Sequence, residues 1–280
     1  MKILVSGSGG QLAREIIKTA PSHGYEVEAP AKDAFNVTDF RAVFDVISDS
    51  RPDIVINCAA FNDVDRAEKN WEDAFMVNGI GVKNLACACR KYDAVLVHFS
   101  SDYVFCGDGR RPYTIADRPE PINRYGQSKL LGEELLKNHL DRHYLIRTSW
   151  VFGEGKYSFP KKVLQWASTN EMLRIVDDQI SSPTYTVDLA DAVMKLIRTE
   201  NFGLYHMTNS GHCSRYEWVA FILEKTKWQG RLQPAKGEEF DTPARRPGFS
   251  VLDNFPIAET LGSFLPSWQD ATDRFLRDEE

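Results

Sequence analysis

A glycine-rich turn close to the start of the chain constrains the fold more than any other feature. The apolar run Lys2–Ser6 leads into Gly7-Ser-Gly9-Gly10, and helical hydrophobic periodicity follows from Gln11 to about Ala20. A strand, a tight glycine turn and a helix in this order can hold a pyrophosphate at the positive end of the helix. We therefore predict a dinucleotide site here, the alternative being an ordinary glycine-rich turn.

The same strand-and-helix unit recurs through the first 150 residues. Strands are expected at Tyr25–Ala29, Asp53–Asn57, Ala94–His98 and His143–Arg147, with helices near Thr38–Ser48, Val64–Tyr92 and Arg124–Leu140. The strands are apolar at nearly every position, which is typical of a parallel sheet covered by helices on both faces. We predict an α/β fold with a doubly wound, Rossmann-like parallel sheet.

The pattern loosens after Val151. Helices are expected at Phe159–Ser168, Val187–Arg198, Arg215–Lys227 and Ser267–Arg277, and a strand at Gly203–Met207. We predict a dinucleotide-binding domain over residues 1–150, completed by about 185–207, and a smaller substrate-binding lobe from residues 151–184 and 208–280. Such a lobe would close over the carboxyl ends of the strands, where open α/β sheets bind ligands.

Charge and composition exclude several classes of partner. The net charge of −6 is scattered along the chain, and no basic cluster exceeds a pair of residues, so a nucleic-acid partner is disfavoured. Five cysteines without a C-x-x-C spacing indicate reduced, structural thiols. No apolar run approaches the roughly 20 residues that span a bilayer. The chain also enters a strand too early to leave room for a signal peptide, so we expect a cytoplasmic protein without a membrane partner.

The end of the second strand bears on the choice of cofactor. A carboxylate there would bind the ribose 2′-hydroxyl of NAD, whereas a basic side chain accommodates a 2′-phosphate. The sequence continues Pro30-Ala31-Lys32-Asp33, with Lys32 close to the expected place and no carboxylate at it. We predict NADPH, with NADH as the alternative; a solvated loop charge is an equally weighted interpretation of Lys32.

A tyrosine and a lysine lie four residues apart in Tyr125-Gly-Gln-Ser-Lys129, within an expected helix. This spacing places both side chains on one helical face, where the ammonium could lower the pKa of the phenol and hold a ribose. A second such string, Tyr157–Lys161, contains Pro160, which belongs at a helix start or in a loop, so we exclude it.

Two serines, Ser100 and Ser101, stand where the fourth expected strand ends. A hydroxyl at this edge can bind a carbonyl oxygen that a tyrosine on the next helix protonates. A plain serine turn is the alternative. We predict that Ser101, Tyr125 and Lys129 form a catalytic set.

With these motifs in place, the chain resembles the extended short-chain dehydrogenase/reductases, and specifically the dTDP-4-dehydrorhamnose reductase family. The matching segments extend over nearly the whole chain and occur in the same order as in the family. They are Gly7–Leu12, Cys58–Ala60, Val64–Glu68, Ser100–Phe105, Tyr125–Lys129, Arg147–Val151, Asp178–Thr184 and Ala244–Pro247.

The resemblance implies roles for individual residues. Tyr125 would donate the proton and Lys129 would orient the ribose; Ser101, Asp102, Trp150 and Arg246 would lie at the substrate. Core packing for Trp150 and a surface charge for Arg246 are the alternatives. Together with Gly7 and Lys32, the expected cofactor contacts are Gly10, Gln11, Leu12, Asn36, Val37, Ala59, Ala60, Asn62, Ser100, Tyr125 and Lys129.

Three positions depart from the family pattern. Ser101 replaces a usual threonine but keeps the hydroxyl, and Asn36 replaces a usual aspartate near the adenine. The segment Phe61-Asn62-Asp63 places an added carboxylate in a loop that would border the sugar. That carboxylate could alter which sugar is accepted.

The implied reaction is hydride transfer from a nicotinamide to the C4 ketone of a nucleotide-activated 6-deoxy sugar, most directly dTDP-4-dehydro-L-rhamnose, giving dTDP-L-rhamnose. The alternatives are a reductase that makes another deoxysugar such as a 6-deoxy-talose, an epimerase or dehydratase, and a non-catalytic regulatory subunit of the methionine adenosyltransferase type. No metal site is predicted, because only Glu15 could suggest one. A homodimer is left open.

Overall fold

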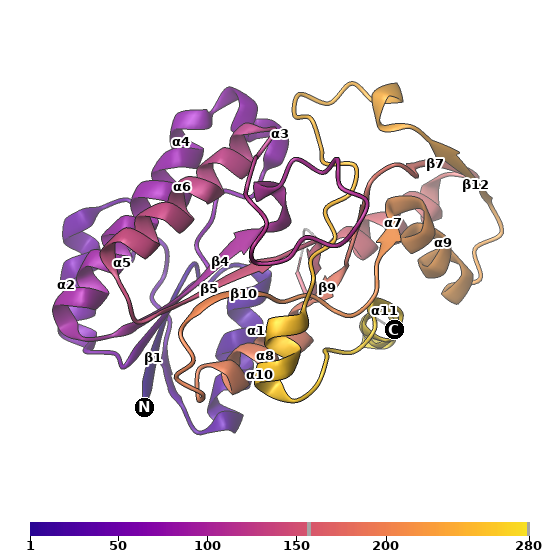
Figure 1. Cartoon of the computed structure of the whole chain (residues 1–280). Coiled ribbons are helices and arrows are strands. Elements are labelled where there is room, and N and C mark those ends of the chain that lie inside the picture. Colours follow the sequence, from indigo (N-terminus) through magenta and orange to yellow (C-terminus); the bar gives the residue numbers. More distant parts are fainter. Residues whose placement is uncertain (156–157, 279–280) are drawn as a thin grey trace.

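A six-stranded parallel sheet forms the centre of the computed structural model, which describes residues 1–155 and 158–278 (Figure 1). Its strands, in spatial order, are β2 (Glu26–Glu28), β1 (Lys2–Ser6), β3 (Ile54–Asn57), β4 (Val95–Ser101), β5 (His143–Thr148) and β10 (Gly203–His206). All neighbouring strands in this sheet run parallel. The predicted doubly wound α/β fold is confirmed.

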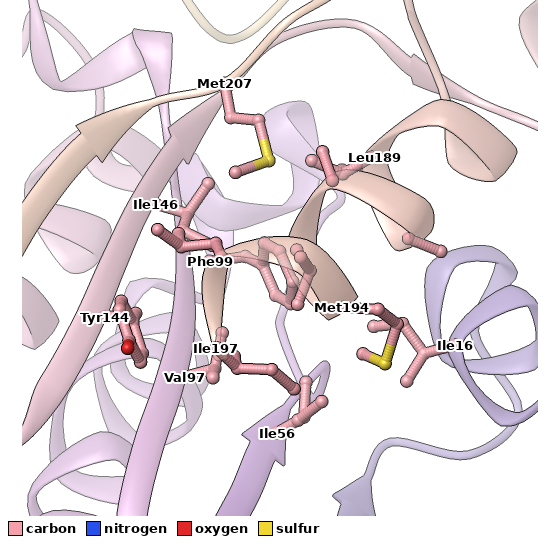
Figure 2. Packing of buried hydrophobic residues seen from close by; sticks show 14 of the residues in the cluster. Ile16, Ile56, Val97, Phe99, Tyr144, Ile146, Leu189, Met194, Ile197 and Met207 are labelled. Atoms are coloured by element: carbon pink, nitrogen blue, oxygen red, sulfur yellow. The ribbon is translucent and has the colours of Figure 1, made fainter. Parts of the chain in front are cut away.

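Helices cover both faces of the sheet. One face carries α1 (Gln11–Thr19), α8 (Thr186–Leu196) and α10 (Phe255–Leu261); the other carries α2 (Phe40–Ser50), α5 (Gly81–Tyr92) and α6 (Arg124–His139). In Figure 2, Ile56, Val97 and Ile146 of three neighbouring strands face Ile16 of α1 and Leu189 of α8. The alternate strand residues Val55, Leu96 and Leu145 are buried on the opposite face, which explains why the strands read as continuous apolar runs.

The segment between β3 and β4 is divided into shorter helices. These are α3 (Val64–Lys69), α4 (Trp71–Phe75) and a π-helical turn (Met76–Ile80) that continues directly into α5. Asn70, between α3 and α4, has φ −111° and ψ 49°, which lies outside the helical region and explains the first break. Asp39 caps α2 and accepts hydrogen bonds from the amides of Arg41 and Ala42.

The remaining chain contains α7 (Phe159–Thr169), α9 (Arg215–Lys225) and α11 (Trp268–Asp278), close to where helices were expected. Helix α10 and most strands of this part were not predicted. Four of these strands have only two residues each, which is too short for a periodic pattern. Their pairs are β6 (Val151–Phe152) with β9 (Thr184–Tyr185), β8 (Ile180–Ser181) with β11 (Cys213–Ser214), and β7 (Met172–Val176) with β12 (Arg231–Ala235). Short 3₁₀ turns occur at Ala20–His23, Asp102–Val104 and Gly237–Glu239.

The second Tyr-x-x-x-Lys string, which we excluded, lies at the start of α7. Pro160 lies in the first turn of α7, as expected for the excluded string, whereas Tyr157 of that string lies outside the described residues. The division of the chain into a dinucleotide-binding domain and a substrate lobe stays a prediction. Among the helices that the structure describes, none is long and apolar enough to cross a bilayer.

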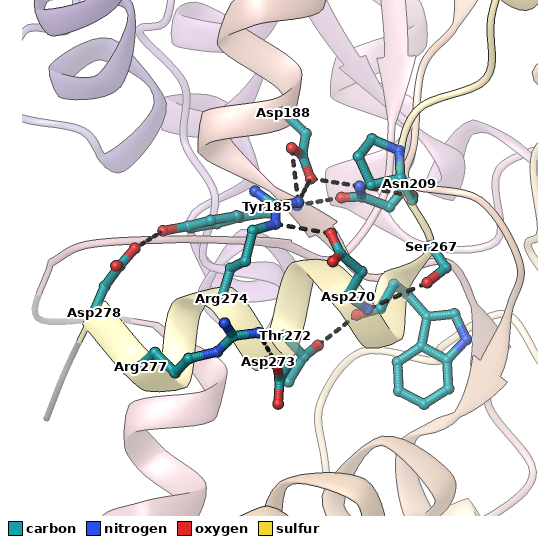
Figure 3. A network of polar contacts seen from close by, with 12 residues as sticks. Tyr185, Asp188, Asn209, Ser267, Asp270, Thr272, Asp273, Arg274, Arg277 and Asp278 are labelled. Carbon is teal, nitrogen blue, oxygen red and sulfur yellow. Dashed lines mark hydrogen bonds and ion pairs between the residues drawn. The ribbon is translucent and has the colours of Figure 1, made fainter.

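A polar network fastens the last helix, α11, to the central fold (Figure 3). Arg274 of α11 donates two hydrogen bonds to the buried carboxylate of Asp188 on α8, at 2.7 and 2.9 Å. The amide of Asn209 donates to the same carboxylate at 2.6 Å. The hydroxyl of Tyr185 donates to Asp278 at 3.0 Å. Helix α11 is thus joined to a helix that packs directly on the sheet.

Candidate active site

The glycine turn between β1 and α1 requires glycine at position 7. Gly7 has φ +68°, and a Cβ atom there would lie 2.6 Å from the amide nitrogen of Ala59, so the fold itself demands glycine. The amide of Gly10 donates to the carbonyl of Gly7 at 2.9 Å and brings the chain into α1. Gly10 caps α1 without any side-chain hydrogen bond to the helix amides. The predicted cofactor residues Gly7, Gly10 and Ala59 therefore lie together at the amino end of α1.

The turn also has features that the protein's own atoms do not explain. A Cβ atom at Gly9 would meet nothing within 4 Å, and its φ is not in the left-handed region, so neither packing nor backbone strain requires glycine there. The side-chain oxygen of Gln11, in the next turn, is buried without a hydrogen-bond partner among the described residues. Close approach by a phosphate group accounts for glycine at position 9, and the unpartnered oxygen of Gln11 could accept from a ribose hydroxyl, so the residues fit a dinucleotide.

The residues predicted at the adenine and ribose lie around the next two strand ends. Val37 is buried, and its carbonyl accepts a hydrogen bond from Asn84 of α5 at 3.0 Å. The side-chain oxygen of Asn36 accepts from the amide and hydroxyl of Thr38, which leaves only its amide group for a ligand. Lys32 and Asn62 are exposed.

The predicted catalytic residues meet at the carboxyl end of β4. Helix α6 carries Tyr125 and Lys129 on its buried side, and the ammonium of Lys129 donates to the carbonyl of Phe99 in β4 at 2.8 Å. The phenol of Tyr125 hydrogen-bonds the hydroxyl of Ser101, the last residue of β4. The ring of Tyr103 packs edge-on against that of Tyr125, with 5.9 Å between centroids.

Burial is the largest influence on the pKa values of Tyr125 and Lys129. It raises the pKa of Tyr125 above its usual value, while the hydrogen bond with Ser101 opposes the rise. The net shift of the Tyr125 pKa is upward, so burial outweighs any lowering by the ammonium of Lys129. The pKa of Lys129 itself is lowered to about 8 by burial, against the opposing charge of Glu133. Tyr125 therefore keeps its proton at neutral pH, as a proton donor requires.

Asp102, the residue after the strand end, is a buried carboxylate held by three hydroxyls. Ser101 donates to one oxygen at 3.0 Å, and Ser181 and Ser250 donate to the other at 3.1 and 2.6 Å. Burial raises the pKa of Asp102 to about 6, against these hydrogen bonds and the charge of Arg215. Since Ser181 and Ser250 belong to later parts of the chain, Asp102 joins the strand end to the predicted substrate lobe.

A second buried network fixes Ser100. Its hydroxyl donates to Glu133 of α6 at 2.6 Å, and the same carboxylate accepts two hydrogen bonds from Arg147 of β5 at 2.9 and 2.6 Å. The hydroxyl proton of Ser100 is thus committed, and its oxygen can only accept from a cofactor. Glu133 was missed in the sequence because its role depends on an arginine 14 positions away.

The loop after β3 is held in place from the π-helical turn. Asn78 accepts from the amide of Phe61 at 2.8 Å and donates to the Phe61 carbonyl at 3.0 Å and to Ser128 of α6 at 2.9 Å. Asp63 caps α3 by accepting from the amide of Arg66 at 3.0 Å. The added carboxylate in this loop thus has a structural partner of its own.

The two remaining substrate candidates have different surroundings. Trp150 is a non-glycine residue with φ +42°, and its ring stacks on that of Trp218 with 5.9 Å between centroids. Strained backbone of this kind clusters at functional sites. Arg246 forms a two-pronged pair with Asp65 of α3, at 2.6 and 3.1 Å. Its charge is therefore already partnered within the chain.

A glycine turn at a helix start, followed by a hydroxyl, a tyrosine and a lysine at the end of the fourth strand, defines a nicotinamide-dependent oxidoreductase of the short-chain dehydrogenase/reductase class. The model of the RmlD substrate binding domain matches residues 1–280. The chain therefore belongs to the dTDP-4-dehydrorhamnose reductase family.

Three relatives illustrate the similarity. The spore coat polysaccharide biosynthesis protein SpsK of Bacillus subtilis is 42% identical, over 99% of this chain and 97% of that protein. The dTDP-4-dehydrorhamnose reductase of Sinorhizobium fredii is 35% identical, over 99% of this chain and 97% of that protein. The crystal structure of dTDP-4-dehydrorhamnose reductase from Bacillus anthracis in complex with NADP is 34% identical, with a TM-score of 0.95 and 99% of each chain covered.

Proposed function

We propose that this enzyme uses NADPH to reduce the C4 ketone of a nucleotide-activated 6-deoxy sugar, with dTDP-4-dehydro-L-rhamnose as the favoured substrate. The proposal is supported by the family membership and by the relatives named as dTDP-4-dehydrorhamnose reductases. The observation that carries it is the pair of hydroxyls of Ser101 and Tyr125, hydrogen-bonded to each other beside Lys129 at the carboxyl end of β4.

The residues divide the work between proton transfer and positioning. Tyr125, which burial keeps protonated, delivers its proton to the ketone oxygen as negative charge develops there. The hydroxyl of Ser101 can turn from Asp102 toward that oxygen and stabilise the charge. Lys129 holds the nicotinamide ribose, and the turn from Gly7 to Leu12 holds the pyrophosphate. The cofactor supplies the hydride.

A related deoxysugar is the second candidate product. The observation that favours it is the 42% identity with SpsK, a protein of spore coat polysaccharide biosynthesis. Another 4-keto sugar on the same nucleotide would need the same proton donor and hydride. It would differ in its contacts with Trp150 and with the loop at Phe61, which Asn78 holds in place and which we expect to border the sugar.

The test is NADPH oxidation with a panel of dTDP- and UDP-linked 4-keto sugars, using wild type and Tyr125→Phe. We expect turnover with one nucleotide sugar and a fall in kcat of about 10²- to 10⁴-fold in the variant. Tyr92→Phe is the matched control, since Tyr92 lies at the far end of α5 beside Phe44. Unchanged turnover of Tyr125→Phe would remove Tyr125 from the mechanism. Full activity without added cofactor would favour an epimerase instead.

A further inference from the structure

Arg215, the first residue of α9, has a guanidinium group that lies among aromatic rings and forms no ion pair with the described residues. The group lies 3.5 Å from the centroid of the Trp150 ring and 4.5 Å from that of Phe159. In the described part of the chain, it makes no hydrogen bond and no ion pair. No local pattern marks Arg215 as functional, because Ser214 and Glu217 identify the position only as the start of a helix.

Three other buried or half-buried arginines in this protein have an acidic partner. Arg147 pairs with Glu133, Arg246 with Asp65 and Arg274 with Asp188. Arg215 differs, and burial lowers its pKa to about 10 even though Asp102 lies near enough to oppose the change. Both oxygens of Asp102 are occupied by serine hydroxyls, so that carboxylate is not a direct partner. A desolvated cation without an anion is costly unless a ligand provides one.

The stacking leaves the donors of Arg215 available. Cation–π contact uses the flat face of a guanidinium, whereas its N–H groups point outward in the plane. A planar pair of N–H donors matches two oxygens of a phosphate group. The arrangement therefore suits a phosphate that approaches the edge of the guanidinium.

The location of Arg215 connects it to the reacting groups. Trp150, over which it stacks, lies two residues after the end of β5 and has the strained φ of +42°, and the charge of Asp102 acts on the guanidinium from the end of β4. Arg246 is a second cation close enough to lower the Arg215 pKa. The guanidinium thus lies near the carboxyl ends of β4 and β5, within reach of the charge of Asp102, where a ligand with phosphate groups would meet positive charge.

We propose that Arg215 binds the diphosphate of the nucleotide sugar, with Trp150 as the platform that holds the guanidinium and faces the sugar. This inference rests on the proposed function. A sugar whose C4 ketone lies at Tyr125 carries its diphosphate on C1, across the ring. Arg215 supplies the counter-charge for it from the predicted substrate lobe, independently of the glycine turn that serves the cofactor.

The experiment measures binding of dTDP and of UDP by calorimetry, together with NADPH oxidation, for wild type, Arg215→Met and Arg215→Lys. We expect Arg215→Met to bind the nucleoside diphosphate about 10- to 100-fold more weakly, since hydrogen bonds to charged groups are worth roughly 1.5–3 kcal/mol. Arg215→Lys keeps the charge but not the planar donors, so its loss should be smaller. KM for the nucleotide sugar should rise more than kcat falls. Arg41→Met removes the same charge from the exposed side of α2 and should bind like wild type.

The outcomes separate this inference from the proposed function. If wild type neither binds dTDP or UDP nor reduces a nucleotide sugar, the proposed function fails. If wild type does both but Arg215→Met binds the diphosphate as tightly, the assignment of Arg215 is overturned. An equal loss of NADPH affinity in Arg215→Met would also overturn it, because that loss would mean general disruption of the fold. A melting temperature within a few degrees of wild type checks that the aromatic cluster has survived.

Discussion

At the residue scale, Asp102 is the most unusual group, because a carboxylate at the reacting edge is buried among hydroxyls and has no direct cationic partner among the described residues. Its raised pKa of about 6, against an ordinary 3.8, means that the folded protein binds this proton more tightly than the unfolded chain does. Between these two values, stability falls as the pH rises, and above about 6 the full cost of the buried charge is present. At neutral pH, the charged acceptor beside Ser101 therefore lowers the stability of the fold.

Asp102→Asn tests this cost. The stability of wild type relative to the variant should decrease by up to about 3 kcal/mol between pH 4 and pH 7, because about two units of pKa shift correspond to that energy. The measurement is urea unfolding of both proteins across this range, and the difference cancels the other titrating groups. Asp49→Asn, on the exposed side of α2, should give a flat difference. A flat difference for Asp102→Asn would mean that the carboxylate is not desolvated in solution.

Single residues were predictable where their role is local. The role of Gly7 could be predicted because a strand and a helix adjoin it in the chain. The pairing of Tyr125 with Lys129 could be predicted from their helical spacing. The three hydroxyls on Asp102 come from positions 101, 181 and 250, and the cluster around Arg215 includes Trp150 and Phe159. No periodicity links such distant positions, so only the folded chain reveals them.

At the scale of elements, close packing of α6 on the π-helical turn sets the position of the catalytic helix. A Cβ atom at Gly132 of α6 would come within 2.1 Å of the carbonyl oxygen of Asn78, so the two segments meet backbone to backbone. The side chain of Asn78 then links the loop at Phe61 to Ser128 of α6. A π-helical turn at this point is consistent with the frequent use of such turns at functional sites.

Asn78→Ala should therefore affect both stability and substrate binding. We expect a loss of about 2–4 kcal/mol, since buried polar partners are left unsatisfied. KM for the nucleotide sugar should increase several-fold, while NADPH affinity changes little. Urea unfolding and steady-state kinetics measure the two effects, with Asn138→Ala on the exposed face of α6 as the control. Lost stability with an unchanged KM would show that the loop at Phe61 does not depend on Asn78.

The strands of the central sheet could be predicted because they are buried on both faces, whereas the short strands of the C-terminal part could not. Strands such as β3 and β4 are buried on both faces, and their apolar runs are visible in the sequence. Strands β6, β8, β9 and β11 have two residues each and are defined by the partners they meet. Their existence depends on the docking of distant segments and leaves no local pattern.

At the scale of the whole molecule, polar contacts over long sequence distances hold the two predicted parts together. Asp65 and Arg246 pair across 181 positions, and Asn123, which caps α6, also donates to the carbonyl of Arg245. The helix that carries Tyr125 therefore begins at a contact with the C-terminal part of the chain. We infer that the catalytic helix and the predicted substrate lobe keep a fixed relation through these contacts.

The C-terminal helix extends this argument to the unfolding of the molecule. Phe275 of α11 packs with Phe152 and Trp218 in the core of the C-terminal part, while Arg274 of the same helix pairs with Asp188 of α8. Leu189, next to Asp188, lies in the core that packs on the sheet (Figure 2). The pair of Arg274 and Asp188 is drawn in Figure 3. One helix thus contacts both cores, and loss of its ion pair should weaken both together.

Arg274→Met should lower the free energy of unfolding by about 2–4 kcal/mol, because it leaves the buried carboxylate of Asp188 without its cation. Asp188→Asn removes that uncompensated charge, so the double variant should be more stable than the sum of the two single losses predicts. Unfolding followed by tryptophan fluorescence, which reports mainly on the C-terminal cluster, and by circular dichroism should give coincident transitions in every variant. Two separate transitions, with Arg274→Met shifting only the fluorescence, would instead mean that the parts unfold independently and that α11 belongs to one of them. Coincident transitions that move together would mean that the ion pair couples the sheet to the part of the chain that we expect to bind the sugar.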